Sequence, residues 1–271
     1  MKLSFNATTL RSFDVSQAMH LIRDAGYDGV ELAVNDAHLH PYKSAPEQIK
    51  AVRALCADIG LAIACVAAGG PTVLGDPPYE PSFITADAKG RAARLEVARR
   101  CIEMAQALGC KTVNVNSGLP THLVAADQAQ DYLLEGLSAL LPALGDDTVL
   151  ALEPEPNFFV GTTTKALEII RAIDSPKLRL NLDIGHVFCS QSHCYEAVEE
   201  ALPYTRHIHI EDIKGNVHHH EIPGDGDIDF HRIVGAIKAA NYEHYVSVEL
   251  HHHDQMWQQA LDRSRSYLLA L

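Results

Sequence analysis

Residues 173–183, IDSPKLRLNLD, show the pattern that decides the fold: a turn rich in Asp, Ser and Pro leads into a short apolar strand. A helical pattern precedes the turn, with Ala166, Leu167 and Ile170 on one face. The same order of amphipathic segment, stop and apolar run recurs at residues 23–32, 57–66, 106–115, 144–153, 202–210 and 239–250. Together with the opening MKLSFNA, this pattern predicts eight strands, near Lys2–Ala7, Gly29–Ala33, Leu61–Val66, Lys111–Asn116, Val149–Glu153, Leu178–Asp183, Arg206–Ile210 and Tyr245–Leu250.

Eight strand–helix units in 271 residues match the size of the eightfold barrel, which typically has ~250 residues. The strands read as nearly continuous apolar runs, as in a parallel sheet buried on both faces. Helices are expected to begin near Asp14, Asp87, Thr164 and Asp229. We therefore predict an α/β protein with a single (β/α)8 TIM-barrel domain over residues 1–271. The alternative is a doubly wound open sheet, although no GxGxxG motif follows the first strand.

The composition excludes several classes of protein. The chain has 35 acidic and 22 basic residues, a formal net charge of −13, which disfavours a nucleic-acid partner. No apolar run approaches the ~18 residues of a membrane span, and the first residues lack the apolar core of a signal peptide. We therefore expect a cytoplasmic protein with no membrane partner. The six cysteines form no CxxC pair and are expected to be reduced, mostly buried thiols.

Four consecutive predicted strands end in residues that can bind a metal ion. In a barrel the carboxyl ends of the strands meet at the active-site face. Carboxylates brought together there repel one another unless a cation neutralises them. Three carboxylates and one imidazole suit a divalent ion: Mn²⁺ is favoured, with Mg²⁺, Co²⁺ or Zn²⁺ as alternatives. The predicted metal ligands are Glu153, Asp183, His209 and Glu249.

Several motifs resemble those of a known family, and this resemblance supports the predicted metal site. LEPEP (152–156), LDIGH (182–186), HIHIED (207–212) and VEL (248–250), with GYDGVEL (26–32) and PGDGDIDF (223–230), resemble the xylose-isomerase-like barrel superfamily of sugar isomerases and epimerases. The resemblance covers essentially the whole chain. It implies the same four metal ligands, with Glu153 and Glu249 as a catalytic acid–base pair. It also implies that His186, three residues after Asp183, contacts the substrate.

The resemblance predicts a divalent-metal-dependent isomerase or epimerase that acts on a keto-sugar or keto-polyol. The proton next to a carbonyl is acidic enough to remove only when the resulting enediolate is stabilised, and a divalent ion supplies that stabilisation. One glutamate would remove the proton and the other return it. At least one of them must then be monodentate, with an oxygen left near the substrate. A dehydratase or lyase of an inosose or 3-keto-sugar is the alternative on the same site.

Other residues near the predicted mouth leave several alternatives open. Where tagatose 3-epimerase-like relatives have a second glutamate, this chain has Phe159, so a simple ketohexose 3-epimerase is disfavoured. Glu155 is either a substrate contact or a loop charge. The His218–His220 run could contact substrate, with His220 the candidate, bind a second metal or lie in solvent. The His251–His253 run is expected to be mostly exposed.

Three further interpretations concern a strand histidine, a Gly-rich run and a long loop. His207 is expected to be a hydrogen-bonded barrel histidine. The Gly-rich run Pro223–Asp229 could cradle a phosphate, but its acidic residues favour a tight turn with Asp229 as a helix cap. The unpatterned stretch Ala68–Phe83 is either a lid or an ordinary surface loop.

Two other classes of function are alternatives to a sugar isomerase or lyase. A metal nuclease resembling endonuclease IV would need histidines at the ends of the third and fourth strands, which read IACVAAGG and VNVNSG here. A non-catalytic binding barrel is the other alternative, although all four ligand positions are intact. The expected partner is a small carbohydrate substrate, and a homo-oligomer is an open option.

Overall fold

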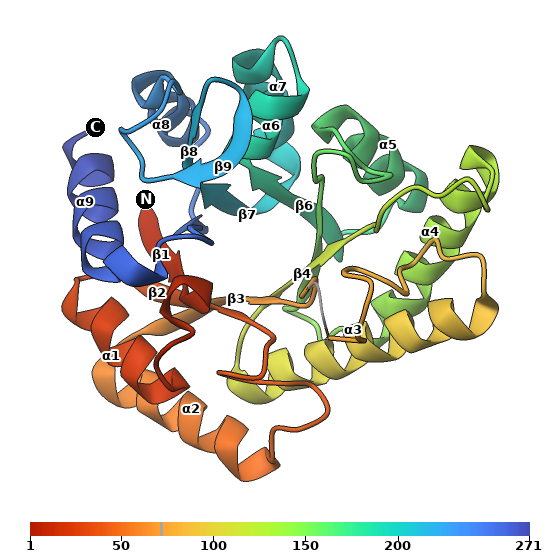
Figure 1. Cartoon of the computed structure of the whole chain (residues 1–271), viewed down its shortest axis with the longest axis horizontal. Helices are drawn as coiled ribbons and strands as arrows, with labels where there is room; N and C mark the ends of the chain where they lie inside the picture. Colours follow the sequence, from red (N-terminus) through yellow and green to blue (C-terminus); the bar gives the residue numbers. More distant parts are fainter. Residues whose placement is uncertain (71–72) are drawn as a thin grey trace.

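The chain folds into a closed barrel of eight parallel strands, in a computed structural model that describes residues 1–70 and 73–271 (Figure 1). The strands follow the order β1-β10-β7-β6-β5-β4-β3-β2, and β1 closes the circle by pairing with both β2 and β10. The predicted (β/α)8 TIM barrel is confirmed, and the open-sheet alternative is wrong. The barrel strands are β1 (Lys2–Asn6), β2 (Gly29–Ala33), β3 (Ala62–Ala67), β4 (Thr112–Asn116), β5 (Val149–Glu153), β6 (Leu178–Asp183), β7 (Thr205–Ile210) and β10 (Tyr245–Val248).

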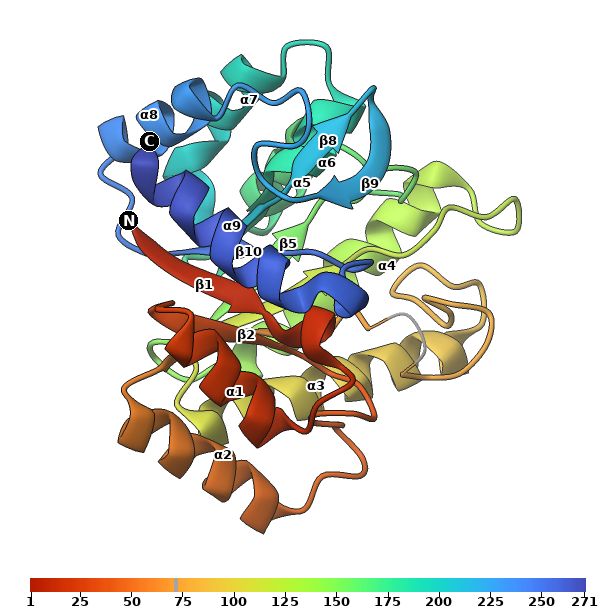
Figure 2. The ribbon, with the colours of Figure 1, turned by 60° about the vertical axis from the view of Figure 1, so that its left-hand side comes forward.

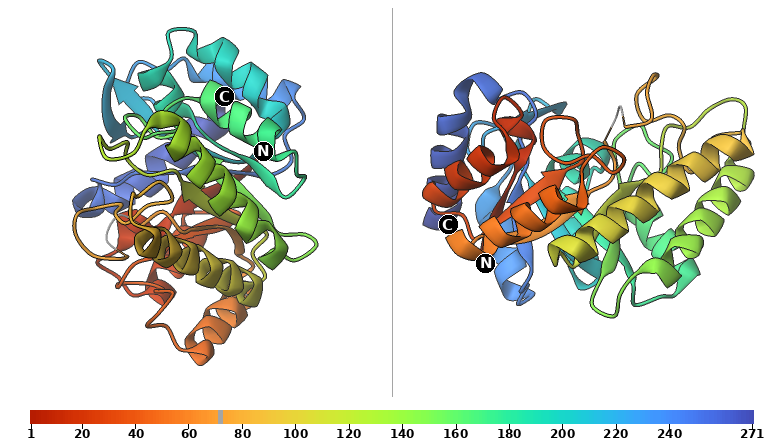
Figure 3. Two further views of the ribbon diagram at one scale, coloured as in Figure 1. Left: turned by 90° about the vertical axis from the view of Figure 1, so that its right-hand side faces the viewer. Right: turned by 90° about the horizontal axis from the view of Figure 1, so that it is seen from below.

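Helices surround the barrel, as Figures 1, 2 and 3 show from several directions. Asp14, Asp87 and Asp229 each cap a helix by accepting a hydrogen bond from the backbone N–H three residues on, as predicted. The predicted start at Thr164 is two residues late, because the cap is Thr162. No helix in the described ranges is both long and apolar enough to cross a bilayer. The helices are α1 (Val15–Asp24), α2 (Pro46–Ile59), α3 (Ala88–Leu108), α4 (Ala126–Leu140), α5 (Thr163–Ile173), α6 (Ile184–Ser190), α7 (Cys194–Ala201), α8 (Phe230–Ala239) and α9 (Trp257–Ala270).

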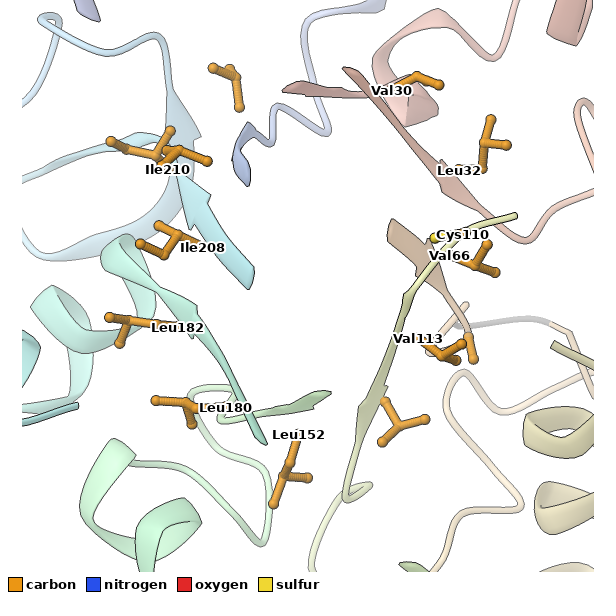
Figure 4. Close-up of a cluster of buried hydrophobic side chains, with 14 of the residues drawn as sticks. Val30, Leu32, Val66, Cys110, Val113, Leu152, Leu180, Leu182, Ile208 and Ile210 are labelled. Carbon is orange, nitrogen blue, oxygen red and sulfur yellow. The ribbon is translucent and has the colours of Figure 1, made fainter. Parts of the chain in front are cut away.

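The apolar core lies between the barrel and its helices. Successive residues of a strand point to opposite faces, and the outward-facing set includes Leu152, Leu182 and Ile208, all fully buried (Figure 4). The alternate positions of the same strands are buried as well, but many are polar, such as Asn181 and His207. The strands are thus buried on both faces as expected, yet their inner face is largely a polar network.

A hairpin that the sequence did not predict follows β7. It consists of β8 (Asp212–Lys214) and β9 (Val217–Glu221), which pair antiparallel. The buried carboxylate of Asp212 anchors it by accepting hydrogen bonds from the backbone N–H groups of Gly224, Gly226 and Ile228, at 2.9, 2.7 and 3.1 Å. A Cβ at Gly226 would lie 2.4 Å from Asp212 Oδ1, so only glycine fits there. The run Pro223–Asp229 is therefore a tight turn whose amides bind the chain's own carboxylate.

Two further expectations concern the cysteines and the long loop. All six cysteines are free: Cys56, Cys65, Cys101 and Cys110 are buried, and the other two are half-buried. In the stretch Ala68–Phe83, residues 71–72 lie outside the described part of the chain, and its remaining residues form no helix or strand. Its role as a lid therefore stays a prediction.

The anchoring of the hairpin leads to a prediction about stability. Asp212→Asn removes the charge that four backbone amides share, that of Ile213 included, and turns an N–H group toward some of them. The free energy of unfolding should therefore fall by about 1.5–3 kcal/mol. Urea denaturation followed by circular dichroism would measure the change. Asp146→Asn, at an exposed position, is the control. An equally small change in both variants would contradict the anchoring role.

Candidate metal and active site

The four residues predicted as metal ligands converge at one end of the barrel. Glu153 and Asp183 end β5 and β6, His209 lies near the end of β7, and Glu249 follows β10 directly. One ligand atom of each lies within 4.8 Å of those of the other three. All four side chains are buried, with at most 7% of each residue exposed. Strands β5, β6, β7 and β10 are consecutive around the barrel, so the four residues form an arc at its mouth.

His209 occupies the centre of this arc. Its Nδ1 atom lies 2.8 Å from Glu153 Oε1, 3.3 Å from Glu249 Oε2 and 3.6 Å from Asp183 Oδ2. Burial alone would lower the pKa of His209, but the carboxylates of Glu249, Glu31 and Glu153 outweigh it and hold the pKa well above the usual range. The surrounding field therefore strongly favours positive charge at this point.

The opposite nitrogen of His209 is fixed by a residue that the sequence analysis missed. His209 Nε2 lies 2.9 Å from Glu31 Oε1, and His207 Nε2 lies 2.9 Å from Glu31 Oε2. Glu31 is fully buried on β2, and it precedes His209 by 178 residues in the sequence. This contact directs Nδ1 toward the carboxylates, as a second partner does for a metal-binding histidine. The prediction that His207 is a hydrogen-bonded barrel histidine is confirmed.

The donor set fits a divalent cation. Asp183 Oδ1 accepts a hydrogen bond of 2.7 Å from the backbone N–H of His186, whereas its buried Oδ2 has no hydrogen-bond partner among the described residues. A buried carboxylate oxygen without a partner is costly unless a cation compensates it. Three carboxylate oxygens and one imidazole nitrogen are ligands that hard or borderline divalent ions accept.

Two asparagines hold the glutamates of the arc. Asn114 Nδ2 donates to Glu153 Oε2 at 2.8 Å, and Asn6 Nδ2 donates to Glu249 Oε1 at 2.8 Å. Both asparagines are buried, with 3% and 1% of the residue exposed. The sequence analysis did not identify Asn6 or Asn114, because each was taken as part of an apolar strand. The partner of Asn6 lies 243 residues further along the chain, and the partner of Asn114 lies on the neighbouring strand.

The three predicted substrate contacts lie beside the arc. His186 Nδ1 lies 2.8 Å from the carbonyl oxygen of Pro154, and its Nε2 is 3.6 Å from Glu155 Oε1. His220 Nδ1 lies 2.9 Å from the carbonyl oxygen of Glu249. Burial raises the pKa of Glu155 to about 8, and burial lowers the pKa of His220 to about 3. His186 and His220 are thus buried and hydrogen-bonded, whereas Glu155 is half-buried beside His186.

The two histidine runs are not uniformly exposed. His220 is buried, whereas His219 is exposed, because they lie on opposite faces of β9. His218 turns to the same side as His220, and their Nε2 atoms are 3.0 Å apart. In the second run His253 is buried and His252 is exposed. The interpretation of the first run as a purely solvated loop is therefore wrong for His220.

A cavity of about 630 Å³ opens onto the arc. Glu153, Glu155 and Glu249 are among its lining residues, as are Asn116 and Tyr79. Among the described residues that line the cavity, Arg11 is the one Lys or Arg side chain. The cavity therefore offers many hydrogen-bonding groups and little fixed positive charge.

With this geometry, comparisons with known proteins assign the chain to a family. The family model described as xylose isomerase-like TIM barrel matches residues 19–267. The chain belongs to this family. The resemblance seen in the sequence motifs is thereby confirmed.

Individual relatives extend this assignment. L-ribulose-5-phosphate 3-epimerase UlaE of Salmonella typhimurium is 24% identical over 231 residues, which cover 83% of this chain and 78% of that protein. Among solved structures, 3-keto-D-glucoside 4-epimerase YcjR of E. coli has a TM-score of 0.80 at 20% identity, over 100% of both chains. The IolI protein with a bound zinc atom has a TM-score of 0.82 at 21% identity, over 100% of this chain and 97% of that one. The two structures show the same fold, and the curated epimerase supports the prediction of an enzyme that acts on sugars.

The arc leads to a prediction about ion binding. After treatment with EDTA, Mn²⁺ at 100 times its dissociation constant should stabilise the protein by about 2.7 kcal/mol, because it binds only the folded arc. Differential scanning calorimetry would show this as a rise in melting temperature. Asp183→Asn should abolish most of the rise, whereas the exposed control Asp146→Asn should keep it. An unchanged rise in Asp183→Asn would contradict the assignment of this ligand.

Proposed function

We propose that the protein is a divalent-metal-dependent isomerase or epimerase of a keto-sugar or keto-polyol. The observation that carries the proposal is the buried arc, in which Glu153 and Glu249 flank Asp183 and His209 and both line the cavity. Relatives that are sugar epimerases by name support the class of reaction. The acidic chain and these relatives give no support to the nuclease alternative.

Glu153, Asp183, His209 and Glu249 would hold the ion, each through one atom that faces the others. A bound divalent ion supplies Lewis-acid stabilisation of the negative charge that develops on the substrate oxygens. Mn²⁺ is the proposed ion, and the zinc atom in the related IolI protein supports divalent binding by this fold. The proposal concerns one ion for each chain.

The two glutamates would move the proton. They sit at the two ends of the arc, with β6 and β7 between their strands, so they can approach a substrate from different sides. One carboxylate takes the proton from the carbon next to the carbonyl, and the other returns a proton to the opposite face, which inverts that carbon. Return of the proton to the neighbouring carbon gives isomerisation instead. His186, Glu155 and His220 would orient the substrate hydroxyl groups above the arc.

A neutral substrate agrees best with the charges around the cavity. Asp36, Glu153, Glu155 and Glu249 line it, against one arginine in the described lining. The Gly-rich turn that could have bound a phosphate is filled by Asp212. Phe159, in place of a second glutamate, packs against the apolar core, which argues against a simple ketohexose 3-epimerase. We therefore propose an unphosphorylated keto-sugar or keto-polyol other than the ordinary ketohexoses.

Proton exchange provides the test of this proposal. In heavy water with Mn²⁺, a panel of unphosphorylated ketoses and inososes should contain a compound that gains deuterium at the carbon next to its carbonyl. Glu153→Gln or Glu249→Gln should slow that exchange by about 10²–10⁴-fold or more, because each removes a proton carrier. Nuclear magnetic resonance would follow the exchange.

The exposed Glu168→Gln on α5 is the matched control and should exchange at the wild-type rate. Full exchange in either active-site variant would contradict the acid–base pair. Absence of exchange across the panel by the Mn²⁺-loaded wild type would contradict the proposed reaction.

A further inference from the structure

We propose that Asn6 and Asn114 are positioning residues that make Glu249 and Glu153 bind the ion through one oxygen only and hold the second oxygen in place for proton transfer. This inference rests on the proposed function. It starts from the two buried hydrogen bonds of 2.8 Å that these amides donate to the glutamates.

The two oxygens of each glutamate have different surroundings. Glu153 Oε1 faces His209 Nδ1 at 2.8 Å, whereas its Oε2 accepts from Asn114. Glu249 Oε2 lies 3.3 Å from the same nitrogen, whereas its Oε1 accepts from Asn6. Turning a glutamate to bind an ion through both oxygens would leave a buried amide N–H without its partner, which is costly. The amides therefore enforce a single coordinating oxygen at each end of the arc.

The donors come from the strands that flank the arc. The arc occupies β5, β6, β7 and β10, and its outer neighbours in the barrel are β4 and β1. Asn114 lies on β4 and Asn6 on β1, so each end of the arc is closed by the next strand. Strand pairing fixes both placements, since Asn116 is opposite Glu153 and Phe5 is opposite Val248. The barrel register thus places one amide donor beside each glutamate of the arc.

An amide donor also suits a carboxylate that must accept a proton. A carboxylate oxygen has two lone pairs, so it can accept from the amide and still receive a proton. The hydrogen bond fixes the direction in which that oxygen points and leaves its other lone pair free. Asparagine does not titrate, so the donor is present at every pH.

Folding stability does not account for Asn114. Its Oδ1 atom is buried and has no hydrogen-bond partner among the described residues. A buried carbonyl without a partner destabilises the folded chain. An apolar residue of similar size would avoid that loss, so the retained amide points to its contact with Glu153.

The first test measures the metal site without substrate. Asn6→Leu and Asn114→Leu keep the volume and remove the donor. Titration calorimetry of the EDTA-treated proteins should show Mn²⁺ binding weakened by about 10–100-fold, as for other residues that orient metal ligands. Infrared difference spectra on Mn²⁺ binding should show the carboxylate stretching bands of the glutamates shifted from the monodentate to the bidentate pattern. Ser4→Ala, buried on β1 two residues before Asn6, is the control.

The second test separates the two asparagines. L-ribulose and its C3 epimer serve as probes, or the epimer pair that exchanges fastest in the ketose panel. Each glutamate removes the proton from one epimer, so loss of its asparagine should slow deuterium uptake mainly from that epimer. The ratio of the two uptake rates should therefore move in opposite directions in Asn6→Leu and Asn114→Leu. A general loss of structure would move both rates together.

The outcomes distinguish this inference from the proposed function. If the wild type neither binds Mn²⁺ nor exchanges, the proposed function fails. If the wild type does both, and the Leu variants have wild-type Mn²⁺ affinity, infrared bands and rate ratio, only the positioning role fails. Should a Leu variant not fold, as judged by circular dichroism, Asn6→Ala or Asn114→Ala replaces it with the same expected results.

Discussion

The interaction on which the site depends is the mutual repulsion of carboxylates buried at one end of the barrel. Glu153, Asp183 and Glu249 converge there, and Glu31 lies just below them. In water such charges would be screened, but within the barrel they need a compensating positive charge. His209 supplies part of it, since it touches all four carboxylates within 3.6 Å. The remaining negative charge is the reason for proposing a divalent cation at this site.

The rest of the fold separates this polar network from the apolar core. Strand alternation sends residues such as Leu152 and Ile208 outward to the helices and leaves the inner positions to polar groups. The helices are therefore held by apolar packing that does not involve the site. Changes in the ligands should alter metal binding and chemistry, whereas the barrel itself is stabilised elsewhere.

Sequence reasoning predicted both the barrel and the four residues that converge at its mouth, because both can be recognised from local patterns. Strand ends can be recognised from an apolar run that stops at Glu153 or Asp183 without knowledge of distant residues. The asparagine donors and Glu31 could not be found in this way, because their roles depend on partners up to 243 residues away. The hairpin was missed because β9 has three consecutive histidines, which give no apolar strand pattern. Its alternation explains why His220 is buried and His219 is exposed.

The turn at Pro223–Asp229 has a consequence for how such a barrel could change its specificity. Its three amides form a receptor for a negative charge, and Asp212 of the same chain fills it. The carboxylate of Asp212 therefore occupies the site that an external anion would need. Replacement of Asp212 by a small neutral residue would free three donors at once. One amino-acid substitution thus turns this anchored turn into an open anion receptor. A barrel of this kind could therefore evolve toward phosphorylated ligands in a single step.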